Sequence, residues 1–219
     1  MYKSINSWFL FFMMLTGSSS LQASDLDLQN RLLIKRECIK CNLNKHDLRK
    51  ALLHNVMLSG SQLNQAKLQE ANLQGADLSG ASLRGAHLEG ANLRGANLRG
   101  ADLEGCFLNG ADLSMAELGV ANLRSSDLRA ANLLGATLEG ADLENANLSV
   151  ADLGLSNLKG ANLKGTNLQS ANLRGADLSR AELSGAMLCN TKVPSGEVEY
   201  SGCIIPLLRE ALRDEVVGQ

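Results

Sequence analysis

Leucine occupies every fifth position of this chain from Leu43 to Leu188 without a skipped step. Such a period means that each unit cannot bury its apolar side alone and must stack on neighbouring units. An α-helix would scatter these leucines, because successive ones would be rotated by about 140° around its axis. A flat strand would send alternate leucines to opposite faces. The chain must therefore turn a corner every five residues, so that all the leucines point inward.

The position two residues before each leucine is nearly always small. Alanine is most common there, and the usual substitutes include Cys106, Ser126, Ser156 and Thr166. Since residues two apart share a face, these positions are predicted to point inward as well. The other three positions are predicted to face outward, and the last of them is often glycine. Glycine tolerates positive φ, which is typical of a repeated tight corner.

The units ANLRG, ANLRG and ADLEG of residues 91–105, and ADLSR and AELSG of residues 176–185, resemble the pentapeptide-repeat family, whose unit is written A(D/N)LXX. The resemblance covers residues 41–193. It implies an all-β solenoid: a right-handed, four-sided parallel β-helix with four units per coil. The fourfold count comes from the resemblance, because five-residue spacing does not fix it. An open solenoid leaves unpaired strand edges at both ends, so short helical caps are expected there.

The N-terminal cap is assigned to residues 24–40, where Ser24 and Asp27 are placed like a helix-start capping pair. Its apolar residues are Leu28, Leu32, Leu33 and Ile34. The C-terminal cap is assigned to residues 194–219, as a hairpin followed by a helix. The apolar stripe of that helix comprises Leu207, Leu208, Ala211, Leu212 and Val216. The stripe suits either a lid over the end of the rod or a contact that forms a homodimer.

Residues 1–23 look like a secretory signal peptide, with Lys3 in a short polar start, an apolar run at 8–15 and small residues before Ala23. Cleavage is expected after Ala23. The apolar run is far shorter than the ~20 residues of a membrane helix, so no membrane span is expected once the signal is removed. The protein is therefore expected in the periplasm, an equivalent lumen or outside the cell. An uncleaved anchor is the alternative.

Export favours disulfides, which persist outside the reducing cytosol. Cys38 and Cys41 form a Cys-x-x-Cys pair at one mouth of the rod. Cys189 and Cys203 bracket a segment that resembles the C-terminal close of many exported pentapeptide-repeat proteins, which implies a cross-linked hairpin. Closing that span would stabilise the fold by about 3 kcal/mol in the chain-entropy model. Cys106, in an alanine slot, is expected to be a buried free thiol.

The Cys38/Cys41 pair leaves two other roles open, a redox centre or half of a zinc site. The zinc site is disfavoured because no second Cys-x-x-Cys exists, and because His46 has an inward slot while His54 and His87 lie outward on different sides. The redox role lacks the strand-and-helix context of a thioredoxin-like fold. A structural role is favoured, and no metal or cofactor is expected.

No catalytic site is predicted either. The outward carboxylates recur as corner residues and solvated charge, and no nucleophile with a paired base is visible. The glycines recur every five residues and mark corners, so they do not form a phosphate-binding loop between a strand and a helix. The chain is therefore interpreted as non-enzymatic.

The quinolone-resistance members of the family imply an alternative function, an acidic rod that occupies the DNA groove of gyrase. The formal net charge here is only −2, and removal of the signal peptide takes away Lys3 and no acid. One side reads Arg84, Glu104, Arg124, Glu144 and Lys164 in successive coils. Nucleic-acid binding is disfavoured as well, since it needs clustered Lys and Arg with stacking aromatics, and aromatic residues make up 3% of the chain.

The sequence thus favours an exported structural or protein-interaction scaffold whose partner is another protein. Apolar residues that fall in outward slots include Phe107, Met115, Leu134 and Leu155. Met115, Leu134 and Leu155 share one side, and we predict that they line a weak partner patch. The alternative is that they are isolated surface residues, which are common in proteins.

Overall fold

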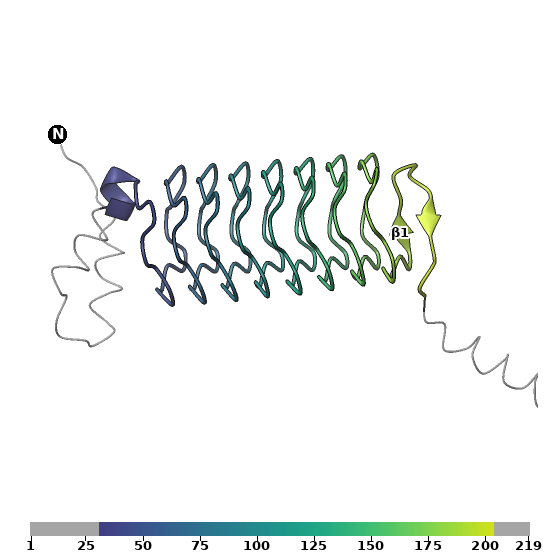
Figure 1. The fold of residues 1–219 in the computed structure, drawn as a ribbon, viewed down its shortest axis with the longest axis horizontal. Helices are drawn as coiled ribbons and strands as arrows, with labels where there is room; N and C mark the ends of the chain where they lie inside the picture. Colours follow the sequence, from purple (N-terminus) through teal and green to yellow (C-terminus); the bar gives the residue numbers. More distant parts are fainter. Residues whose placement is uncertain (1–30, 204–219) are drawn as a thin grey trace, which may run out of the picture.

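The computed structural model describes residues 31–203. Its coils stack side by side into a straight rod (Figure 1). A short π-helix, η1 (Arg31–Lys35), lies at the N-terminal end, and a hairpin of β1 (Thr191–Lys192) and β2 (Val198–Glu199) lies at the other. The predicted signal peptide and the predicted C-terminal helix fall outside the described residues.

Each coil is 20 residues long. Every residue between the small slot and the leucine forms a parallel bridge with the residue 20 positions later, from Glu37↔Met57 to Asn172↔Lys192. Each unit is hydrogen-bonded to both the following and the preceding coil. For example, Leu93 N–H donates to Asp112 O of the following coil at 2.7 Å, and Asn92 N–H donates to Ala71 O of the preceding coil at 2.9 Å. Four five-residue units therefore complete one coil. The fold is a right-handed, four-sided parallel β-helix, as predicted.

The fifth residue of every unit makes the corner. All corner residues from Lys40 to Asn190 are left-handed, with φ between 51° and 73°. Glycine adopts this conformation without the steric penalty that a Cβ brings, which explains why it recurs there. Two β-branched residues, Val120 and Val150, nevertheless hold corners at φ 51° and 63°.

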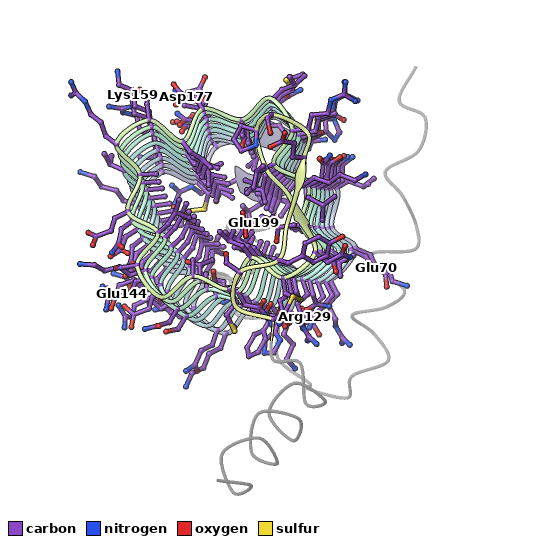
Figure 2. All side chains as sticks on the ribbon, turned by 90° about the vertical axis from the view of Figure 1, so that its right-hand side faces the viewer. Glu70, Arg129, Glu144, Lys159, Asp177 and Glu199 are labelled. Carbon is purple, nitrogen blue, oxygen red and sulfur yellow. A yellow bond between two sulfur atoms is a disulfide. The ribbon has the colours of Figure 1, made fainter. Side chains whose placement is uncertain are left out.

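The core is a continuous column of leucine with small residues beside it. Every leucine slot from Leu53 to Leu173 has an exposed fraction of 0%. Figure 2 looks along the rod and shows side chains filling the inside of the square, with the charged groups outside. Hydroxyls in the small slots bond to the backbone: Ser126 Oγ donates to Leu123 O at 2.7 Å, and Thr166 Oγ1 donates to Leu143 O at 2.9 Å.

The N-terminal end differs from the expected helical cap over residues 24–40. Within the described residues the helix is only η1, and the parallel ladder already begins at Glu37, because Cys38 takes a leucine slot and its N–H donates to Met57 O at 2.8 Å. Leu32 is 4% exposed and Leu33 packs beside it, but Ile34 is 69% exposed. The short helix therefore buries Leu32 and leaves Ile34 at the surface.

The C-terminal hairpin starts inside the last coil. β1 pairs with β2 in antiparallel register, Thr191 opposite Glu199 and Lys192 opposite Val198. Lys192 also bridges to Asn172 of the preceding coil, so β1 joins the hairpin to the rod. The hairpin therefore begins slightly before residue 194, where it was expected.

Candidate interaction surfaces

The outward residues form columns, because each side chain stacks on the residues 20 positions before and after it. We number the sides in chain order: the first side carries Leu83 inside, the second Leu88, the third Leu93 and the fourth Leu98. The first side holds the column of alternating charge that the sequence predicts. Its basic and acidic side chains form ion pairs between neighbouring coils. Within the described rod, each of the other three sides carries fewer ion pairs between coils.

Two arginines organise the first side. Arg84 Nη1 lies 2.7 Å from Glu104 Oε2 and 3.2 Å from Asp102 Oδ2. Arg124 Nη1 repeats this arrangement in a later coil, bound to Asp142 and Glu144. The hydrogen bond to Glu104, followed by that to Asp102, raises the pKa of Arg84 above its ordinary value. The charges on this side are therefore compensated in place, and no anionic stripe forms along it.

Asparagine and aspartate also stack in ladders, which the sequence reasoning missed. Asn122 Nδ2 donates to Asp102 Oδ1 at 3.0 Å on the first side. On the third side, Asn132 and Asn172 make the same bond to Asp112 and Asp152, at 3.1 and 2.8 Å. The signal was available, since each pair is an Asp followed by an Asn 20 residues later. These bonds occupy one carboxylate oxygen of each aspartate.

A disulfide joins Cys38 to Cys41 at the N-terminal mouth, and both residues are buried. The buried Ser61, stacked above Cys41, bridges the turn between them. Its Oγ donates to Cys38 O at 2.6 Å and accepts the Cys41 N–H at 3.0 Å. Thiol exchange needs access to a sulfur, so this enclosed position suits a structural disulfide better than a redox centre.

The second disulfide joins Cys189 to Cys203 and ties the end of the hairpin to the last coil. The remaining cysteine, Cys106, is a free buried thiol whose Sγ donates to Leu83 O at 2.8 Å. Burial raises its pKa to about 12, so the thiol stays protonated at neutral pH and is a poor nucleophile. The thiol is buried because Cys106 occupies one of the inward positions that alanine usually holds.

The histidines do not come together. His46 Nδ1 lies 3.1 Å from Asn44 O, and His87 stacks on Phe107 with ring centroids 4.7 Å apart. His87 Nδ1 also lies 3.1 Å from Glu89 Oε1. Across residues 31–203, no group of three or more His, Cys, Asp or Glu side chains is arranged to hold a metal ion.

The C-terminal end of the rod is only partly covered. Leu178, Leu183 and Leu188 point inward but remain partly exposed. The hairpin covers one part of the coil, where Leu188 N–H donates to Ser201 O at 3.0 Å, and Figure 2 shows this segment crossing the square near Glu199. The N–H groups of Leu178 and Leu183 find no backbone acceptor among the described residues. The residues of the predicted stripe, 207–216, lie outside the structure's described range.

The three apolar residues predicted to form a patch are all exposed. The exposed fractions are 59% for Met115, 37% for Leu134 and 70% for Leu155. They belong to three successive coils of the third side, with Leu134 in the middle coil. Val150, at the other edge of the same side, is also exposed. The structure therefore places these side chains close together on one surface.

None of the helices in the described part of the chain has both the length and the apolar character needed to cross a membrane. The family model described as "Pentapeptide repeats (8 copies)" matches residues 38–69, 76–115, 121–160 and 156–192. The match extends over more than half of the sequence. The chain therefore belongs to the pentapeptide-repeat family and is a pentapeptide-repeat scaffold.

Several solved structures are similar to this chain. HetL, a pentapeptide repeat protein involved in heterocyst differentiation regulation in the cyanobacterium Nostoc, is 30% identical over 82% of this chain and 100% of its own, with a TM-score of 0.37. A pentapeptide repeat protein of the Arabidopsis thaliana thylakoid lumen is 35% identical over 43% of this chain and 66% of its own, with a TM-score of 0.42.

QnrB1, a plasmid-mediated fluoroquinolone resistance protein, is 19% identical over 84% of this chain and 97% of its own, with a TM-score of 0.36. At that identity the likeness concerns the fold alone. Among curated proteins, no sequence matches this chain.

Proposed function

We propose that this protein is an exported, non-enzymatic scaffold that binds another protein through the outer sides of its rod. The observation that supports export is the pair of disulfides, one at each end of the β-helix. Disulfides form and persist in oxidising compartments and are rare in the cytosol. The signal-like composition of residues 1–23 agrees with this location.

The binding role rests on how the rod uses its residues. The leucines and the small residues are buried in the core, so a partner protein can contact only the outward columns and the two ends of the rod. Those columns present flat sides with exposed apolar residues such as Met115 and Leu155. Exposed apolar groups that cluster on one surface are typical of protein-interaction sites.

The DNA-mimic function is not favoured. A mimic of the DNA backbone needs a continuous negative surface, whereas Arg84 and Arg124 neutralise the carboxylates of the first side. The net charge of −2 is also small for a rod of this length. We therefore expect no effect of the purified protein on supercoiling by gyrase.

Export is tested by cell fractionation combined with mass measurement of the mature N-terminus. We expect a chain that begins at Ser24 in an extracytoplasmic fraction. Alkylation under denaturing conditions without reductant should then modify only Cys106, and reduction should expose all five cysteines. A cytosolic protein that retains Met1 would contradict the proposal.

Binding is tested by photo-crosslinking in the compartment where the protein is found. A photoreactive amino acid is placed at one outward position of each side, using Lys164, Asn109, Arg94 and Lys159 for the first to the fourth side. We expect a discrete adduct with another protein from at least one side. Absence of adducts from all four sides would contradict the proposed function.

A further inference from the structure

The third side carries three exposed apolar side chains that pack over glycines of the next coil. If Gly135 carried a Cβ, that atom would lie 2.9 Å from Met115 Sδ. A Cβ on Gly175 would likewise lie 2.8 Å from Leu155 Cδ2, and a Cβ on Gly154 would lie 3.1 Å from Leu134 Cδ1. Each apolar side chain therefore lies flat over a glycine of the next coil and fills the place of its missing side chain. We call Met115, Leu134 and Leu155 the apolar patch.

The patch is maintained against the conformational preference of its residues. Met115 and Leu155 occupy corners with φ of 57° and 56°, and Val150 holds the opposite edge at φ 63°. Glycine adopts this region without steric penalty, whereas a side chain costs about 1–2 kcal/mol there. The exposed side chains recover little of that cost by burial. The same left-handed conformation recurs at the other non-glycine corners, so it is the exposed apolar side chain, and not the backbone, that sets Met115 and Leu155 apart from the polar corners.

Two arginines mark the ends of the patch. Arg94 and Arg174 stand in the column of Leu134, two coils before and two coils after it. Neither forms an ion pair with a described residue, whereas Arg84 and Arg124 on the first side each bind two carboxylates. Four coils at ~4.8 Å each put the backbones of the two arginines about 19 Å apart along this column.

The acids of the third side do not neutralise these arginines. Asp112 and Asp152 instead accept hydrogen bonds from Asn132 and Asn172. Along the column of Leu134 the third side thus presents arginine, apolar surface and arginine, while Asp112 and Asp152 lie in the neighbouring column, hydrogen-bonded to asparagines. A ligand that complements it has carboxylates at both ends and apolar side chains between them.

We propose that the third side binds an apolar segment of a partner protein that carries carboxylates about 19 Å apart, a spacing of about 13 helical residues. Its apolar side chains lie on the patch, and its carboxylates pair with Arg94 and Arg174. This proposal rests on the proposed scaffold function and names the surface and the kind of partner.

A second copy of the chain is a poor occupant, because the third side is symmetric about Leu134. In an antiparallel, face-to-face dimer with its two-fold axis at Leu134, Arg94 of one copy faces Arg174 of the other. Asp112 likewise faces Asp152. Both contacts join like charges, which disfavours self-association through this side.

The test uses fluorescence anisotropy with the full protein and a labelled 16-residue helical peptide. The probe has two glutamates at each end and leucines at i, i+3, i+4 and i+7 between them. A matched probe has lysines in place of the glutamates. We expect the glutamate probe to bind at least about tenfold more tightly, in line with two charge-assisted contacts.

Two sets of variants assign the contacts. Met115→Ser, Leu134→Ser and Leu155→Ser together should abolish binding, whereas Ile39→Ser, Phe107→Ser and Val120→Ser, which remove exposed apolar side chains on other sides, should leave it unchanged. Arg94→Glu with Arg174→Glu should reverse the preference between the two probes. Arg99→Glu, on the fourth side, should not.

Equal binding of both probes, or an unchanged preference after the double arginine reversal, would overturn the proposal. So would equal loss of binding in the two triple variants, or a homodimer in sedimentation experiments that the patch substitutions dissociate. If no probe binds while crosslinking still yields adducts from another side, this inference fails and the proposed scaffold function stands. If crosslinking also yields no adduct, both fail.

Discussion

The two ends of the rod cover the apolar core in different ways. At the N-terminal end, η1 places Leu32 over the first coils, and Cys38 and Leu43 have exposed fractions of 0%. At the C-terminal end, the hairpin crosses only part of the last coil and leaves Leu178 and Leu183 partly exposed. The interior of a solenoid repeats, so the ends are where a sequence must supply chemistry that is not repeated.

The largest expected difference between the ends concerns their leucines. Leu43→Ala should lower the free energy of unfolding by about 4 kcal/mol, because it opens a cavity in a closed core, whereas Leu183→Ala should cost about 1 kcal/mol. Urea denaturation measures the totals, and hydrogen exchange shows where protection is lost. Equal losses at the two positions would show that the last coil is as well covered as the first.

Next in size is the disulfide of the hairpin. Cys189→Ser with Cys203→Ser should destabilise the protein by about 3 kcal/mol, because the open chain regains the entropy of its 14-residue span. The loss of exchange protection should be confined to the last coil and the hairpin. If protection falls equally at the N-terminal mouth, the two ends do not behave as independent caps.

A smaller effect is expected from Ser61, which closes the N-terminal turn. Ser61→Ala should cost about 1 kcal/mol, since it removes both hydrogen bonds of the buried hydroxyl and leaves the Cys41 N–H and Cys38 carbonyl with only their mutual bond at 3.3 Å. Ser126→Ala is the control, because that hydroxyl bonds only to Leu123 O of the preceding unit in the same coil. The comparison is made by thermal unfolding of both variants. Equal decreases in Tm would show that Ser61 contributes no more than Ser126.

The smallest effect is electrostatic and depends on pH. The hydrogen bond from Arg49 lowers the pKa of Asp47 near the N-terminal end, and Arg129 does the same for Asp127 in mid-rod. A carboxyl whose pKa is lower in the folded state stabilises the fold at pH values above its unfolded-state pKa of about 3.9. This stabilisation is lost as the pH falls from the unfolded-state pKa to the folded-state pKa.

Asp47→Asn and Asp127→Asn should therefore each cost at most about 0.5 kcal/mol at pH 7, because both pairs are screened by solvent. Neither substitution should matter at pH 2. Chemical denaturation at the two pH values measures the difference. A cost that persists at pH 2 would mean that the side chains act through packing and not through charge.

The repeat made the middle of the molecule predictable and the ends less so. The inward leucines, the small slots, the corners and the alternation from Arg84 to Glu104 follow from register alone once four units complete a coil. That count came from family resemblance. Non-repeated segments lack this constraint, so the parallel ladder was expected to start at residue 41, although it already begins at Glu37.

The missed features of the surface have a different cause. The bond from Asn132 to Asp112 and the stacking of His87 on Phe107 join residues that are distant in the sequence. They become neighbours only when the chain is wrapped at 20 residues per coil. The bridging role of Ser61 depends on a hydroxyl direction that no periodic pattern encodes.

The 20-residue coil also limits how such a chain can lengthen during evolution. Insertion of a single unit keeps every leucine inside, so the fold survives, but it moves all later surface residues by a quarter turn. Arg174 would then leave the column of Arg94, and Asn132 would no longer stack on Asp112 if the insertion fell between them. Gain or loss of twenty codons preserves every column. Surface recognition, more than folding, should therefore decide which length variants are retained.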